Sequence, residues 1–118
     1  MAAEFTSYQL LIDVMTPLRL QVGALGIFDF PLGRYVYTGS ARRNFEARIA
    51  RHQRSEKTLR WHIDYLLTAP DVRLNAVIRS CRAECDLNRS VRGLVLVRGF
   101  GASDCRAGCG SHLRYLGR

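Results

Sequence analysis

The chain has 118 residues, of which 47% are hydrophobic and 24% charged, the composition of an ordinary globular protein. No apolar run approaches the roughly 18 residues needed to cross a bilayer, and no long apolar segment follows a positively charged start. We therefore expect a cytoplasmic protein with no membrane partner, folded as a single domain over residues 1–118. The net charge is +8, and clustered positive charge is typical of proteins that bind nucleic acid.

The first third of the chain is predicted to form extended structure. Apolar and β-branched residues indicate a strand over 8–14, and alternation of apolar with polar residues indicates a second extended piece over 18–22. The segment 23–33 contains three glycines and a proline, so we expect a turn-rich connection there. A strand over 34–38 follows.

Both helices and strands are predicted in the rest of the chain. A second helix should place Leu59, Ile63, Leu66 and Leu67 in the core. The elements expected in order are a basic helix ending near 54, a helix over 57–68, a strand over 72–80, a helix over 83–91, a strand over 94–97 and an edge strand over 112–116. This order indicates an α+β, sandwich-like fold, with a small mixed, mainly antiparallel sheet flanked by helices.

The strand, glycine and basic helix between residues 35 and 52 combine groups suited to chemistry. Tyr35 and Tyr37 alternate with a valine, so they share one strand face, and Gly39 allows the chain a sharp exit. Arg48 and His52 are four residues apart and share a helix face. Arginine and backbone N–H groups at a helix start bind phosphate, while tyrosine or histidine transfers protons, so the stretch suits a phosphodiester.

Positive charge is concentrated in the same region, and nucleic acid is therefore the favoured partner. A solvated, arginine-rich helix surface is the alternative explanation of this charge. The nineteen residues 42–60 contain two acids and seven cationic residues: Arg42, Arg43, Arg48, Arg51, Arg54, Lys57 and Arg60.

Five segments in series resemble the GIY-YIG nuclease superfamily, and most closely its small stand-alone branch, DUF123. The matching segments are Gly-Arg-Tyr-Val-Tyr-Thr-Gly-Ser-Ala (33–41), Arg-Ile-Ala-Arg-His (48–52), Trp-His-Ile-Asp-Tyr-Leu-Leu (61–67), Glu-Cys-Asp-Leu (84–87), and Gly-Phe-Gly-Ala-Ser-Asp-Cys with a following Ser-His-Leu (99–113). They stand in the branch's order and cover nearly the whole chain.

The resemblance implies a hydrolytic endonuclease that acts on DNA in repair or processing and uses one Mg²⁺ or Mn²⁺ ion. Tyr8 and Tyr37 fall on the two signature tyrosines, and the family's late asparagine falls nearest Ser103 or Asp104. The residues expected to be catalytic are Tyr8, Tyr37, Arg48 and His52; those expected to bind substrate are Gly39, Ser40, Arg42, Arg43, Arg51 and His62; and the expected metal ligand is Glu84.

The residue types fit this chemistry. Mg²⁺ and Mn²⁺ prefer oxygen ligands and are often held by one carboxylate with water and substrate phosphate, so Glu84 alone is sufficient. Tyr37 can act as a base only if its pKa falls well below about 10, and we expect Arg48, the helix start and the cation to lower it. His52, whose unperturbed pKa lies near neutrality, is the alternative proton acceptor.

Two other functional classes remain open. One is a catalytically weak or inactive nucleic-acid-binding module of the same fold that partners a repair enzyme. The other is a small zinc-stabilised interaction protein with no role on nucleic acid. Its zinc would be held by Cys81, Cys85, Cys105, Cys109 and His112, whose spacing permits zinc but does not distinguish it from reduced thiols or a redox-sensitive pair.

Overall fold

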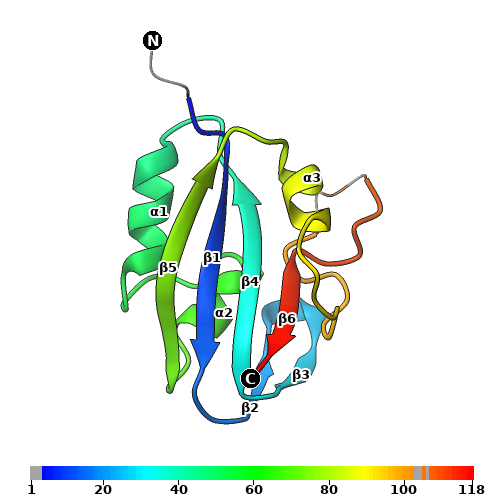
Figure 1. The fold of residues 1–118 in the computed structure, drawn as a ribbon. Helices are drawn as coiled ribbons and strands as arrows, with labels where there is room; N and C mark the ends of the chain where they lie inside the picture. Colours follow the sequence, from blue (N-terminus) through cyan, green and yellow to red (C-terminus); the bar gives the residue numbers. More distant parts are fainter. Residues whose placement is uncertain (1–3, 103–104, 106) are drawn as a thin grey trace.

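The computed structural model describes residues 4–102, 105 and 107–118 and confirms the α+β fold (Figure 1). Its elements are β1 (Ser7–Val14), β2 (Leu18–Gln21), a short 3₁₀ helix (Gly23–Leu25), β3 (Ile27–Phe30), β4 (Gly33–Ser40), α1 (Phe45–Gln53), α2 (His62–Leu67), β5 (Val72–Ser80), α3 (Glu84–Arg89) and β6 (Leu113–Gly117). Four strands form an antiparallel sheet in the order β5-β1-β4-β6, and β2 and β3 pair separately. No helix in the described part of the chain is long and apolar enough to cross a membrane.

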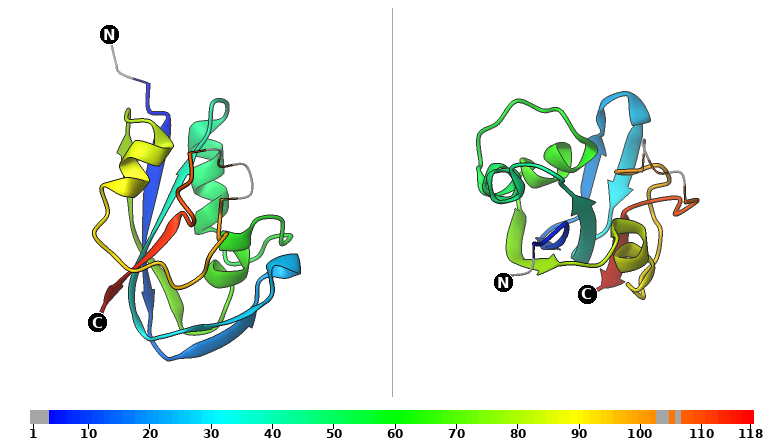
Figure 2. Two further views of the ribbon diagram at one scale, coloured as in Figure 1. Left: turned by 90° about the vertical axis from the view of Figure 1, so that its right-hand side faces the viewer. Right: turned by 90° about the horizontal axis from the view of Figure 1, so that it is seen from above.

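The two faces of the sheet are covered by different helices. Tyr8, Leu10 and Ile12 alternate along β1 and are buried on the face that carries α1 and α2 (Figure 2). On the opposite face the Gln9 side-chain amide donates hydrogen bonds to the Thr38 hydroxyl and to a backbone carbonyl of α3, at 3.3 and 3.5 Å. This placement leaves α3 beside the end of β4, near the start of β6.

The connection between β1 and β4 is more ordered than the sequence predicts. Residues 23–33 were expected to form turns only, but 27–30 form β3, which pairs with β2 as a hairpin. Val22 and Phe30 are fully buried in the common core, and Phe30 packs edge-on against Phe100. The hairpin therefore covers one end of the core, because every second residue of its two strands is apolar and packs against the core.

Of two other predicted elements, one helix forms but starts later than expected, and one strand does not form. The helix expected from residue 57 begins at His62, because the Asp64 carboxylate accepts the backbone N–H groups of Arg60 and Trp61 and fixes the chain in a non-helical approach. Leu59 is consequently 44% exposed and not in the core. Residues 94–97 form only an isolated bridge, between Leu94 and a residue of β6, and Leu94 is mostly exposed.

Candidate active site

A cavity of about 680 Å³ opens where β4 ends, between α1, the start of α3 and the loop before β6. It is walled by residues from six separate parts of the chain, which are β1, β4, α1, the segment 60–62, the start of α3 and the loop before β6, so only the folded protein assembles it. Of the residues expected to be catalytic, to bind substrate or to bind the Mg²⁺ or Mn²⁺ ion, seven line it: Tyr8, Tyr37, Gly39, Ser40, Arg48, His62 and Glu84.

Tyr8 reaches the cavity because a glycine lies opposite it in the sheet. Strand pairing sets Tyr8 beside Gly39, and a Cβ atom at Gly39 would lie 2.6 Å from the phenol oxygen and the ring carbon that carries it. The expected exit turn at Gly39 is wrong, because this residue lies inside β4. Its function is to make room for the aromatic ring.

His52 lies directly behind Tyr8. The Tyr8 hydroxyl and His52 Nε2 are 2.7 Å apart, and both side chains are almost completely buried. Burial, reinforced by the positive charges of Lys57 and the neighbouring arginines, lowers the pKa of His52 to about 4. His52 is therefore neutral at pH 7, and its Nε2 can accept the phenolic hydrogen of Tyr8.

The protein groups around the cavity raise the pKa values of both tyrosines, against the lowering that Arg48 was expected to produce at Tyr37. Burial raises the pKa of Tyr37 well above its usual value, and the Arg48 charge offsets this only in part. Burial likewise raises the pKa of Tyr8 against the effect of Arg48. Removing a phenol from water disfavours its charged form, so both tyrosines remain protonated at neutral pH.

Arg48 forms the positive wall of the cavity. Its guanidinium donates a hydrogen bond of 2.9 Å to the Ser40 carbonyl and lies 4.7 Å from the centre of the Trp61 ring. These contacts hold the side chain over the cavity while leaving N–H groups of its planar fork free for an anion, the arrangement that suits arginine to phosphate.

Glu84 supplies the negative charge of the cavity. The Ser40 hydroxyl donates to one carboxylate oxygen at 2.6 Å, and His112 Nδ1 lies 2.8 Å from the other. Burial would raise the pKa of Glu84, but these two contacts outweigh it and the pKa is lowered. The residue remains a carboxylate at neutral pH.

A single Mg²⁺ or Mn²⁺ ion fits this donor. Each Glu84 oxygen has one such partner and a carboxylate offers about four acceptor sites, so lone pairs remain for a cation. Glu84 would hold the ion together with water and oxygens of a bound molecule, and the ion would supply positive charge in the cavity.

Several predicted substrate-binding residues lie elsewhere. Arg42 and Arg43 are exposed and do not line the cavity. Arg51 donates two hydrogen bonds of 2.9 Å to the fully buried Asp64 carboxylate, so we assign it to the packing of α1 against α2 rather than to substrate binding. His62 does line the cavity, and its Nδ1 accepts a hydrogen bond of 2.9 Å from the backbone N–H of Gly101.

The cavity also contains residues that were not predicted for the site, and two residues named in the sequence lie outside the described part of the chain. Arg60, Trp61 and His112 also line it, although the sequence named Arg60 only as part of the basic cluster, Trp61 only within a matching segment and His112 only as a zinc candidate. Ser103 and Asp104, nearest to the family's late asparagine, lie outside the described residues.

An antiparallel sheet with a tyrosine–histidine pair, an arginine and a glutamate around one cavity defines a GIY-YIG-like protein. The chain belongs to the DUF123 family, because the family model described as "Domain of unknown function DUF123" matches residues 7–118. This family is the stand-alone GIY-YIG-like branch that the sequence resembles. Neither the search of curated proteins nor the search of solved structures finds a match.

Proposed function

We propose that this protein is a divalent-metal-dependent endonuclease that hydrolyses phosphodiester bonds in DNA, in repair or processing. The observation that supports this most strongly is the meeting of Tyr8, Arg48 and Glu84 at one cavity, with His52 bonded behind the tyrosine. A proton acceptor, a phosphate-binding cation and a carboxylate for a metal ion are the groups that in-line attack of water on a phosphodiester requires.

The raised tyrosine pKa values favour a proton relay over a phenolate base. Water would give a proton to the Tyr8 oxygen as Tyr8 passes its own hydrogen to His52 Nε2 across 2.7 Å. The new bond joins the water oxygen to phosphorus, the bond to the leaving oxygen breaks, and that oxygen takes a proton from solvent. His52 then returns its extra proton to solvent through Tyr8, a release that its lowered pKa of about 4 favours. Tyr8 is neutral before and after the step, so its high pKa is no obstacle.

Arg48 would bind the phosphate and stabilise charge that builds on its oxygens in the transition state. Its position over Trp61 and its bond to the Ser40 carbonyl fix the guanidinium before substrate arrives. Fixed donors are more effective than mobile ones, because no reorganisation is needed during the reaction. Arg60, also on the cavity wall, would contribute to DNA binding.

The experiment that tests the proposal is nicking of supercoiled plasmid by the purified protein in Mg²⁺ or Mn²⁺. We expect Glu84→Gln to abolish nicking, while Asp86→Asn, an exposed change on the same helix, leaves it intact. Excess EDTA should stop the wild-type reaction. Equal nicking by Glu84→Gln, or by the wild type in EDTA, would refute the metal-dependent mechanism.

A second candidate is a nucleic-acid-binding module of the same fold with little or no catalysis, a partner of a repair enzyme. The burial that raises the pKa values of both cavity tyrosines favours it. It predicts DNA binding whose log affinity falls with log salt by about 0.9 per phosphate neutralised, with no metal-dependent turnover. Arg48→Ala should reduce that slope by about 1, whereas Arg54→Ala, outside the cavity, should change it less.

A further inference from the structure

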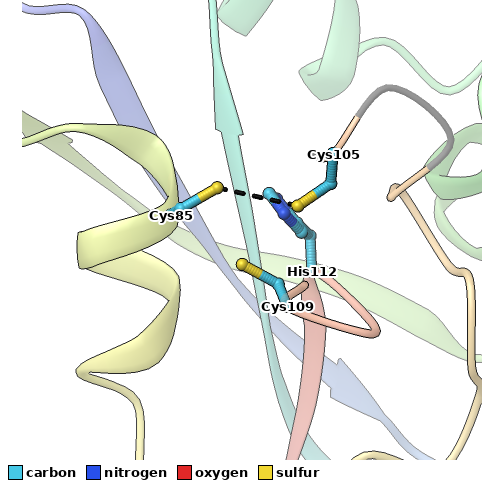
Figure 3. Close-up of side chains that lie close together, drawn as sticks. All are labelled: Cys85, Cys105, Cys109 and His112. Atoms are coloured by element: carbon cyan, nitrogen blue, oxygen red, sulfur yellow. Dashed lines mark hydrogen bonds between the residues drawn. The ribbon is translucent and has the colours of Figure 1, made fainter. Parts of the chain in front are cut away.

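Three thiols and one imidazole gather at the wall of the cavity beside Glu84. Cys85 comes from the first turn of α3, Cys105 and Cys109 from the loop that follows, and His112 from the residue before β6. Figure 3 shows the four side chains pointing toward one another. The sequence spacing permitted zinc without distinguishing it from reduced thiols or a redox-sensitive pair, and it included Cys81, which lies outside this cluster.

We infer that Cys85, Cys105, Cys109 and His112 form a structural Zn²⁺ site. Their ligand atoms all lie within 4.8 Å of one another, and the Cys85 and Cys105 sulfurs are 3.7 Å apart. A tetrahedral ion with Zn–S bonds of about 2.3 Å places its sulfurs about 3.8 Å apart. The cluster therefore has nearly the size of a Cys₃His zinc site.

His112 is oriented as a metal-binding histidine. Its ring is buried, its Nδ1 lies 2.8 Å from a Glu84 oxygen and 3.2 Å from the Thr38 carbonyl, and its Nε2 is buried with no hydrogen-bonding partner among the described residues. A zinc-bound histidine usually donates its other ring N–H to a carboxylate or carbonyl, which fixes the tautomer. Here that bond leaves Nε2 to face the thiols, and a metal ion would satisfy it.

The position of the cluster explains what the metal would do for the fold. In the described residues between α3 and β6, the chain has no helix and only a single isolated bridge. Loops of this length in compact domains need ties of their own. Two side-chain hydrogen bonds join α3 to backbone carbonyls of this loop, from Asn88 to Ser111 at 2.9 Å and from Arg89 to Ala107 at 3.4 Å. Zinc would add a tie that joins α3, the loop and the start of β6 at one point.

The chemistry of the ligands selects the ion. Thiolates favour zinc over magnesium or manganese, whereas the lone Glu84 carboxylate favours the harder ions. The zinc site is thus separate from the cation of the proposed nuclease, although Glu84 links the two through His112. The inference does not depend on catalysis and holds equally for an inactive binding module.

The test compares two serine variants that differ only in whether the cysteine belongs to the cluster. Cys109→Ser removes a ligand, and Cys81→Ser removes an exposed cysteine outside the cluster. Proteins are purified without chelators, and zinc and iron are measured by mass spectrometry. We expect one Zn²⁺ per chain in the wild type and in Cys81→Ser, and near-complete loss from Cys109→Ser after dialysis against a chelator.

If Cys109→Ser does not fold, cobalt substitution and thiol alkylation of the wild-type protein test the zinc site without that variant. Wild-type protein refolded with Co²⁺ should show the intense visible bands of a tetrahedral thiolate complex, and Cys81 should be alkylated long before the other cysteines. Folded wild-type protein with no zinc, with iron in its place, or with a disulfide among these cysteines would overturn the assignment. So would equal zinc in Cys109→Ser and the wild type.

Discussion

Acidification should destabilise this protein through His52 before most carboxylates titrate. In the folded state the pKa of His52 is lowered to about 4 because the ring is buried, whereas in the unfolded chain it is close to 6.5. The unfolded state therefore binds the proton first as pH falls, and stability decreases from about pH 6.5 down to pH 4, where the folded state also binds it.

The size of this effect follows from the two pKa values. Between pH 7 and pH 4, preferential protonation of the unfolded state should lower the free energy of unfolding by about 3 kcal/mol. Solvent screening reduces this change in free energy only slightly, because His52 is only 2% exposed. The loss is a substantial fraction of the stability of a small domain.

Urea denaturation at half-unit intervals from pH 7.5 to 4 measures the effect, with His52→Gln as the comparison. Glutamine keeps a group able to bond to Tyr8 but does not titrate, so the difference in stability between the two proteins should shift by about 3 kcal/mol across this range. Other titrating groups cancel in that difference. Parallel curves for the two proteins would refute the conclusion that His52 is a buried neutral base, and with it the proposed relay.

Three further changes test other parts of the structure. Tyr8→Phe should leave the fold intact and lower the nicking rate about 10²- to 10⁴-fold; an unchanged rate would remove Tyr8 from the relay. Gly39→Ala should displace the Tyr8 ring, because the added methyl would lie 2.6 Å from it, and this is visible as a changed tyrosine environment in near-UV circular dichroism; an unchanged spectrum would contradict the close packing. Asp64→Ala should destabilise the fold by about 3–5 kcal/mol in urea, because it leaves the Arg51 charge and two backbone N–H groups without their acceptor; a loss below about 1 kcal/mol would contradict this.

The parts of the site that depend on local spacing were predictable from the sequence. Tyr37 and Gly39 alternate along one strand, and Arg48 and His52 lie one helical turn apart, so their relative positions follow from the geometry of each element. The structure indeed places Tyr37 and Arg48 on one cavity with His52 adjoining it.

The sequence could not predict the contacts between segments that are far apart in the chain. The fit of Tyr8 against Gly39 depends on the register of β1 with β4, and the partner of Arg51 depends on how α2 packs on α1. Burial decides the direction of the tyrosine pKa values, and no linear pattern reports it. The thiol cluster likewise depends on the path of a loop with no regular hydrophobic period.

The hairpin of β2 and β3 has a consequence for the evolution of this fold. It enters and leaves at the far ends of β1 and β4, which remain direct neighbours in the sheet whatever lies between them. Inserting or deleting residues at the β2–β3 turn thus changes the outline of the protein without moving Tyr8 relative to Tyr37. The distance in sequence between the two tyrosines is free to drift among homologues, while Val22 and Phe30 must stay apolar.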